Sequence, residues 1–155
     1  MGNIIDNQLR VEGPRETLEV FKSSFAIFND AGEIENVELG ILFPIPTLIK
    51  DLAEKDGLNK IANNWKRKMW GLTTWCVVDE SANYIPYSRE SDSLDLYEFT
   101  SNWIEPLAFF INASEVFNTI KFSLTSYDLV NDCARIYEIS NGEITSSKSE
   151  SGIED

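Results

Sequence analysis

Two segments in the first part of the chain show the clearest hydrophobic periodicity. Residues 4–12 alternate between apolar and polar side chains, which predicts a strand with one buried face. Gly13 and Pro14 interrupt the alternation, and residues 14–28 then carry apolar side chains at helical spacing. We therefore expect a helix that begins at the proline. Its apolar stripe consists of Leu18, Phe21, Phe25 and Phe28.

The second half of the chain repeats both periods. Apolar patterning predicts a helix at residues 106–117 that begins at Pro106. It also predicts three strands, at residues 94–99, 120–125 and 134–139. Asn141-Gly142 is a strong signal for a two-residue turn between antiparallel strands. From Thr145 onwards the chain is polar with a single isoleucine, so we expect a disordered acidic tail at 145–155.

The middle of the chain departs from both periods. Pro44 and Pro46 predict a stiff, extended connection, because a proline disfavours helix in the residue before it. Short helical patterns follow, so residues 44–70 are predicted to be a helical insertion. Residues 72–78 are typical of a strand, and the polar residues 79–93 are typical of a long loop.

Without the insertion, the predicted order is strand, helix, strand, strand, helix, strand. This is the order of the ferredoxin-like split β-α-β fold, in which one antiparallel sheet carries both helices on a single face. The predicted fold class is therefore α+β and ferredoxin-like, with a helical insertion and a C-terminal hairpin. A chain of 155 residues fits one domain, so we predict a single domain over residues 1–144, followed by the tail.

The composition excludes several common kinds of catalytic site. The chain has no histidine, which excludes His-dependent acid–base chemistry, Ser-His and Cys-His nucleophile pairs and the common zinc sites. Cys76 and Cys133 are expected to be reduced, because no secretion signal is visible and we expect a cytoplasmic protein. No apolar run approaches the roughly 18 residues of a membrane span. We predict no catalytic residue, metal site or cofactor, and a protein that is not an enzyme.

The formal charge of −13 is unevenly distributed along the chain. Residues 50–68 carry six basic and three acidic side chains, whereas residues 79–155 carry four basic and fifteen acidic ones. Such a negative surface repels a phosphate backbone over a Debye length of about 10 Å. Binding to nucleic acid is therefore disfavoured everywhere except at the basic segment.

The predicted loop at 79–93 and its borders form the candidate partner-binding site. Carboxylates would supply charge for steering and tyrosines would supply contact area, a composition common at protein interfaces. The alternative is a solvated acidic surface with tyrosines that pack in the core. The spacing of a calcium-binding loop is absent. The candidate residues are Asp79, Glu80, Tyr84, Tyr87, Glu90, Asp92 and Asp95.

The basic segment at 65–70 is a second candidate, for contact with nucleic acid. Three consecutive cations flanked by tryptophans suit a phosphate backbone with stacked bases. The alternative is that the tryptophans pack inward and the cations stand in water, and we consider nucleic acid an improbable ligand for so acidic a chain. The residues concerned are Trp65, Lys66, Arg67, Lys68 and Trp70.

Three motifs in sequence order resemble the YubB-like proteins of phages and plasmids. Residues 43–46 (Phe-Pro-Ile-Pro) match a Pro-x-Pro segment, and residues 70–75 (Trp-Gly-Leu-Thr-Thr-Trp) are similar to an Asn-Trp-Gly-Thr-Lys-Trp run with one residue added. Residues 101–106 (Ser-Asn-Trp-Ile-Glu-Pro) resemble a Thr-Ala-Trp-x-Pro-Pro run, with Ser for Thr and Glu for the first Pro. The resemblance implies a ferredoxin-like domain and an origin in a mobile element. It implies no catalytic residues.

Together these features favour a non-enzymatic phage or mobile-element protein that binds a basic host protein through its acidic surface. A defence-system inhibitor that mimics nucleic acid would have this character. The alternative function is an accessory module that associates with nucleic acid through the Trp65–Trp70 segment. The sequence predicts no particular oligomeric state.

Overall fold

A computed structural model of the protein describes residues 3–44, 71, 81–82 and 84–152. Within these residues the protein is α+β, with two helices and a six-stranded sheet. In chain order the elements are β1 (Ile4–Glu12), α1 (Arg15–Phe25), β2 (Ala26–Phe28), β3 (Ile34–Glu38), β4 (Ser81–Ala82), β5 (Tyr84–Ser91), β6 (Leu94–Asn102), α4 (Leu107–Val116), β7 (Lys121–Asp128), β8 (Cys133–Ser140) and β9 (Glu143–Ser151).

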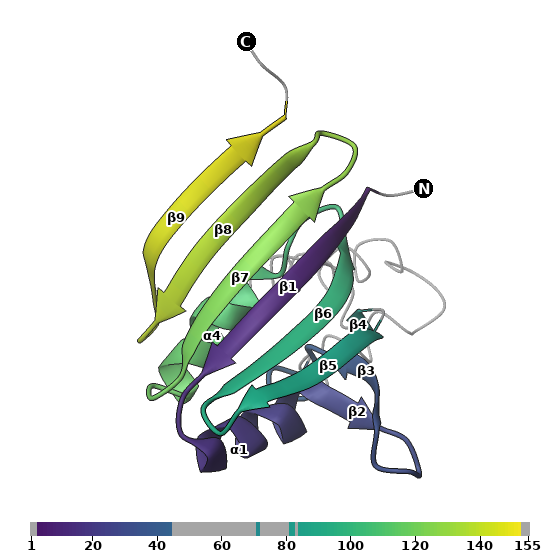
Figure 1. The fold of residues 1–155 in the computed structure, drawn as a ribbon, viewed down its shortest axis with the longest axis vertical. Helices are drawn as coiled ribbons and strands as arrows, with labels where there is room; N and C mark the ends of the chain where they lie inside the picture. Colours follow the sequence, from purple (N-terminus) through teal and green to yellow (C-terminus); the bar gives the residue numbers. More distant parts are fainter. Residues whose placement is uncertain (1–2, 45–70, 72–80, 83, 153–155) are drawn as a thin grey trace, which may run out of the picture.

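The six-stranded sheet has the order β5-β6-β1-β7-β8-β9, and each of these neighbours pairs antiparallel. A smaller antiparallel sheet contains β2, β3 and β4. Helices α1 and α4 both lie on one face of the large sheet, and its other face carries no described helix (Figure 1). No helix of the described ranges is long and apolar enough to cross a membrane.

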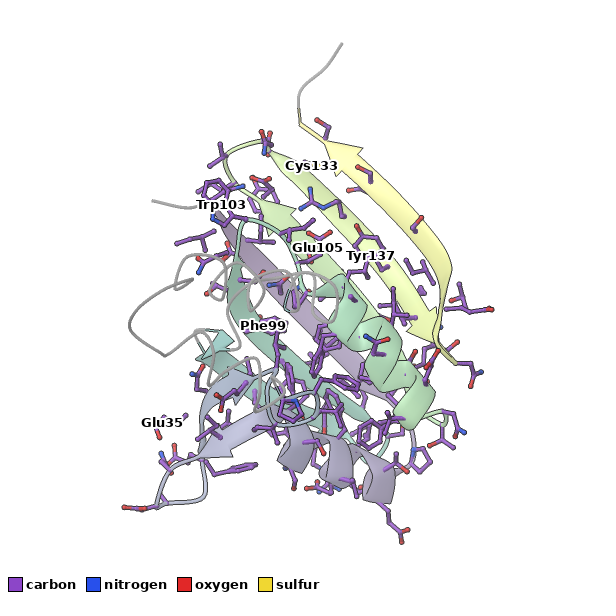
Figure 2. All side chains as sticks on the ribbon, turned by 180° about the vertical axis from the view of Figure 1, so that it is seen from behind. Glu35, Phe99, Trp103, Glu105, Cys133 and Tyr137 are labelled. Carbon is purple, nitrogen blue, oxygen red and sulfur yellow. The ribbon has the colours of Figure 1, made fainter. Side chains whose placement is uncertain are left out.

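The core lies between the helices and the covered face of the sheet, as the side chains in Figure 2 show. Alternate residues of β1 point into it, which gives that strand a strict period of buried and exposed positions. Phe25, at the last turn of α1, lies among the aromatic rings of this core. Its ring centroid is between 5.1 and 5.7 Å from those of Phe21, Tyr97, Phe99, Phe109 and Phe110.

Several predicted elements are confirmed with small changes of boundary. The strand at 4–12 is β1, and the helix predicted at 106–117 is α4 with Pro106 as its N-cap residue. Asn141 and Gly142 have φ of 51° and 77°, the left-handed values that a type I′ hairpin turn requires. The helix predicted at 14–28 ends at Phe25 instead.

The residues after that helix form a hairpin that its apolar spacing concealed. Ala26 is already extended, and β2 pairs with β3 in the smaller sheet. Between the two strands, the Asn29 side chain accepts hydrogen bonds from the backbone amides of Ala31 and Glu33. This local Asx-type bonding stabilises a turn. Phe28 therefore belongs to a strand and is 41% exposed.

Two segments predicted to be irregular are strands. Residues 84–91, expected in a long loop, form β5 at one edge of the sheet, where Pro86 coincides with a bulge in the pairing with β6. Proline is tolerated at such an edge position. Residues 143–151, most of them expected in a disordered tail, form β9, whose side chains are all exposed. The insertion beyond Pro44 and the strand predicted at 72–78 lie outside the described residues.

The position of Phe25 yields a first prediction, on stability. Phe25→Ala removes a fully buried ring and should lower the free energy of unfolding by about 4 kcal/mol. Phe28→Ala is the matched control, and because that ring is already partly in water the loss should stay below about 1 kcal/mol. Urea denaturation followed by circular dichroism measures both. Equal losses in the two variants would contradict the central place of Phe25 in the core.

Candidate functional site

The face of the large sheet opposite the helices, here called the open face, is the first candidate site. Its outward side chains come from the central strand β1 and from β6 and β7 on either side. The register aligns them in rows across the strands. From one end to the other the rows are Thr100, Asp6 and Tyr127; Glu98, Gln8 and Thr125; Leu96, Arg10 and Ser123.

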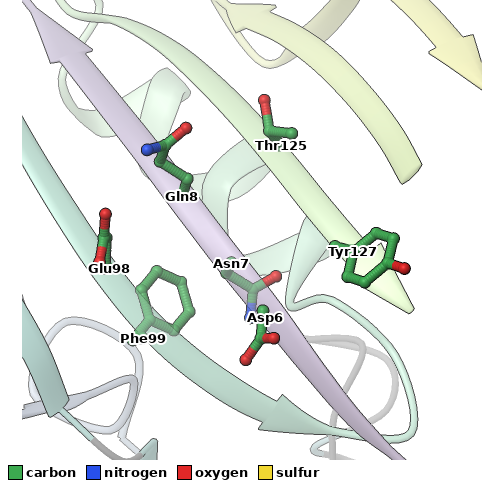
Figure 3. Close-up of a pocket in the computed structure, with 7 residues that line it drawn as sticks. All are labelled: Asp6, Asn7, Gln8, Glu98, Phe99, Thr125 and Tyr127. Carbon is green, nitrogen blue, oxygen red and sulfur yellow. The ribbon is translucent and has the colours of Figure 1, made fainter. Parts of the chain in front are cut away.

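A shallow hollow of about 420 Å³ lies on this face at the first two of these rows (Figure 3). It is lined by Asp6, Asn7, Gln8, Glu98, Phe99, Thr125 and Tyr127. Asn7 and Phe99 have their side chains buried on the opposite side of the sheet. Their main chain therefore forms part of the floor, and the five outward side chains form the rim.

The hollow is rich in hydrogen-bond acceptors, and none of the described residues that line it is basic. Asp6 and Glu98 each bring a carboxylate, and Gln8 and Thr125 add an amide and a hydroxyl. The Tyr127 hydroxyl donates a hydrogen bond to Asp132 Oδ1 at 2.8 Å. That bond to a carboxylate raises the pKa of Tyr127, so the phenol stays neutral and its ring is held in place. Such a lining suits a cation.

Below the hollow, a buried hydrogen-bond network connects the same three strands. Asn7 Nδ2 donates to Ser101 Oγ on β6 at 3.0 Å, and Ser126 Oγ on β7 donates to Asn7 Oδ1 at 2.8 Å. All three residues are buried. The floor of the hollow is thus fixed by side-chain bonds as well as by the backbone ladder.

Exposed apolar side chains gather at the end of the sheet next to the hollow. Ile4 pairs with the last residue of β6, and β7 ends opposite Ile5. The residues that follow these strand ends therefore lie at the same end of the sheet. We call Ile4, Trp103, Ile104, Leu129 and Val130 the end patch; Trp103, Leu129 and Val130 are 64%, 71% and 76% exposed.

Trp103 holds an unusual backbone conformation at the centre of this patch. Its φ is 71°, in the left-handed region that non-glycine residues seldom adopt. A hydrogen bond from its backbone amide to the carbonyl of Asn3 fixes the conformation. Strained residues of this kind concentrate at functional sites.

The sequence-predicted site around residues 79–95 is not one exposed surface. Asp95, expected beside a loop, is 1% exposed and accepts two hydrogen bonds from Arg15 Nη1, at 2.9 and 3.0 Å. The Arg15 guanidinium also donates to the carbonyls of Ser91 and Asp92. This arginine therefore fixes the β5–β6 turn to the start of α1. The prediction that Asp95 is exposed is wrong, because its charge is neutralised inside the protein.

Among the other predicted partner contacts, the described ones differ in exposure. Tyr87 is half-buried, with its ring 5.0 Å from that of Tyr97 and Lys22 Nζ 4.9 Å above it. Glu90 and Asp92 are exposed near the β5–β6 turn, where Asp92 pairs with Arg89. The side chain of Tyr84 and the residues Asp79, Glu80, Trp65, Lys66, Arg67, Lys68 and Trp70 lie outside the described part of the structure.

A buried ionisable cluster joins the start of α4 to β8 on the helix-covered face. Glu105, only 2% exposed, accepts hydrogen bonds from Arg135 Nε and Nη2 at 2.8 and 2.7 Å and from the Tyr137 hydroxyl at 2.8 Å (Figure 2). Burial alone would raise the pKa of Glu105, but the hydrogen bonds from Arg135 and Tyr137 lower it. Burial and the carboxylate raise the pKa of Tyr137 to about 12. The three groups satisfy one another, as in a structural ion pair.

Among the described residues, no three Asp, Glu, Cys or His side chains are grouped so as to hold a metal ion. No family model matches the chain, and no curated protein matches it. The fold resembles the crystal structure of a protein api92 from Yersinia pseudotuberculosis, family model DUF1281. The two chains superpose with a TM-score of 0.65 at 10% sequence identity, over 100% of each chain. At this identity the likeness extends to the α+β fold alone.

The ion pair between Glu105 and Arg135 makes stability depend on pH. A carboxyl whose pKa is lowered by folding stabilises the protein above its unfolded pKa, and this contribution disappears as the pH falls through the folded value. Glu105→Gln should therefore cost about 3 kcal/mol at pH 7. The difference from the wild-type protein should shrink below pH 4.5, the ordinary pKa of this group. Urea titrations across this range measure it.

The control for this experiment is Glu143→Gln, which removes an exposed carboxylate from β9. That variant should track the wild-type protein at every pH. A constant gap between Glu105→Gln and the wild-type protein from pH 7 to below 4 would contradict the role assigned to the buried carboxylate.

Proposed function

We propose that this chain is a non-enzymatic protein of a mobile genetic element that binds a basic protein partner through the open face and the adjoining end patch. The observation that supports this proposal is that most of the described positive charges are neutralised by ion pairs within the chain. Six of the seven basic side chains among the described residues form ion pairs with carboxylates of the same chain. They are Arg15, Lys22, Arg89, Lys121, Arg135 and Lys148.

The surplus charge on the described residues is therefore acidic. They include nineteen acidic side chains against seven basic ones. A partner with positive potential is attracted over several ångströms, and its association is accelerated at low ionic strength. A phosphate backbone is repelled by the same field. This supports a protein partner over a nucleic acid.

The open face and the end patch together supply the charged groups and the apolar contact area of a protein interface. The hollow presents Asp6 and Glu98 for charge complementarity, and the end patch presents Trp103 with its apolar neighbours. Tryptophan and other large side chains carry much of the binding energy at interfaces, mainly by slowing dissociation. Exposed apolar patches of this kind are typical of interaction sites.

We also infer the fold family and origin of the chain. The strands β7, β1, β6 and β5 with α1 and α4 have the order expected of a ferredoxin-like unit, and β8 and β9 would be an addition at its edge. Together with the three motifs described above, this order supports membership of the YubB-like family. A phage or plasmid protein that presents an acidic face in the host cytoplasm suits inhibition of a basic, nucleic-acid-binding host protein by mimicry.

Charge reversal on the open face should slow association with the partner. The partner is first retained from a bacterial lysate on the immobilised protein, eluted with salt and purified. Asp6→Lys/Glu98→Lys should then reduce the association rate at least about tenfold at low ionic strength, with a smaller effect near 150 mM salt. Surface plasmon resonance measures these rates.

Asp30→Lys/Glu35→Lys is the matched control, because it changes the net charge equally at exposed carboxylates of the β2–β3 hairpin. Equal slowing by both pairs would mean that net charge acts without a defined face. Retention of nuclease-sensitive material in place of a basic protein would support the nucleic-acid alternative.

Trp103→Ala should act on the dissociation rate constant. Loss of the exposed indole removes contact area and leaves the charges unchanged, so the dissociation rate should rise about tenfold or more and the association rate should stay near the wild-type value. Val20→Ala is the control, because Val20 is a similarly exposed apolar residue on α1. An unchanged dissociation rate for Trp103→Ala would exclude the end patch from the interface.

A further inference from the structure

We propose that the hollow on the open face is a receptor site for one arginine side chain of the partner. The inference rests on the proposed function, because it specifies how the acidic face recognises a basic protein. It assigns a ligand chemistry to Asp6, Gln8, Glu98, Thr125 and Tyr127.

The first argument is the arrangement of acceptors. Asp6 and Glu98 stand on adjacent strands in neighbouring rows, because Asp6 pairs with Thr100 and Glu98 pairs with Gln8. Gln8 and Thr125 lie beside Glu98 in the same row. Acceptor oxygens therefore surround the hollow from three strands. A guanidinium has five N–H donors in a planar fork and can reach several such oxygens at once, whereas an ammonium is a compact point charge.

The second argument is that the lining leaves these carboxylates available. No basic side chain lines the hollow, and neither Asp6 nor Glu98 is in any of the ion pairs found among the described residues. The nearest cation along β1, Arg10, belongs to the next row and is not part of the lining. Both carboxylates are exposed and therefore available to a cation from outside.

The third argument is preorganisation. The Tyr127 hydroxyl is bonded to Asp132, and Tyr127 stands beside Asp6 in the same row, where an aromatic ring can contact a guanidinium. Beneath the rim, Asn7 ties β1 to β6 and β7 by side-chain hydrogen bonds. A site on a fixed floor loses little entropy when a side chain enters it.

The shape of the hollow argues for a side chain over a free small molecule. Its volume of about 420 Å³ is near the lower end of ligand pockets, which span about 300–1,000 Å³. It opens onto a flat sheet face, so it would leave much of a free ligand in water. The end patch, at the adjoining end of the same sheet, can contact the protein surface from which an arginine projects.

The test uses the full chain and defined probes. Wild-type protein labelled with ¹⁵N is titrated with the peptide acetyl-Gly-Arg-Gly-amide and with analogues that carry lysine or citrulline. The arginine peptide should bind with millimolar affinity and shift the amide signals of Gln8, Glu98 and Thr125. The lysine peptide should bind about fivefold more weakly, the loss of one hydrogen bond, and the neutral citrulline peptide should not bind.

Two variants with the same loss of charge complete the experiment. Asp6→Asn/Glu98→Gln should abolish the shifts, and Asp30→Asn/Glu35→Gln, at exposed carboxylates of the β2–β3 hairpin, should leave them as in the wild-type protein. Shifts spread over carboxylates throughout the protein, equal affinity for arginine and lysine, or unchanged binding by Asp6→Asn/Glu98→Gln would overturn the proposal.

The failure of this inference is distinguishable from failure of the proposed function. If a basic protein is still retained from lysate with the Asp6→Asn/Glu98→Gln variant and the arginine peptide does not bind, the arginine site is refuted and the binding function stands. If the peptide binds as expected and no basic protein is retained, the arginine site stands and the proposed function fails.

Discussion

The register of β1 is the constraint on which the rest of the structure depends. This strand is paired with β6 from Ile4 to Glu12 and with β7 from Ile5 to Glu12, so it sets the position of both neighbours. A shift of one residue would move Asp6 and Gln8 into the core and Leu9 into water. The buried bonds of Asn7 to Ser101 and Ser126 oppose such a shift, because any other register would leave these polar groups without partners.

The same register also gives the sheet two different faces, one covered by helices and one open. The inward residues of β1, β6 and β7 meet α1 and α4 in the aromatic core. The outward residues meet no described helix and form the open face (Figure 1). Two arginines then secure the periphery: Arg15 fixes the β5–β6 turn through Asp95, and Arg135 fixes the start of α4 through Glu105. Each pair neutralises one cation and one buried carboxylate, so the surplus of acidic side chains remains on the surface.

The sequence predicted the elements whose hydrophobic period is visible and missed β5 and β9, in which that period is absent or interrupted. β1, α4 and the Asn141-Gly142 turn follow directly from local pattern. β9 has no buried side chain, so its pairing with β8 leaves no hydrophobic signal. β5 was not predicted because it contains Pro86. A proline indicates a loop unless the strand is known to be at the edge of a sheet.

The candidate site was missed for a related reason. The alternation of residues 4–12 places Asp6 on a polar face, whereas Glu98 shares its face of β6 with Leu94 and Leu96. Only the antiparallel pairing of β1 and β6 brings Asp6 and Glu98 together. Local sequence likewise concealed the burial of Asp95, because its partner Arg15 lies eighty residues away along the chain. Charge clusters in a sequence therefore identify candidate residues, whereas their availability is decided by tertiary pairing.

The separation of core and open face also limits what similarity of fold can say about recognition. Side chains such as Asp6, Glu98 and Thr125 do not touch the core, so they can change without loss of the sheet. In the proposed interface, the carboxylates would act mainly through the association rate, which salt screens, and the apolar end patch would act through the dissociation rate. A simple polycation would contact only the carboxylates and would be released at moderate ionic strength. The proposed partner would have to match the spacing between the hollow and Trp103, and that spacing is set by the register of β1.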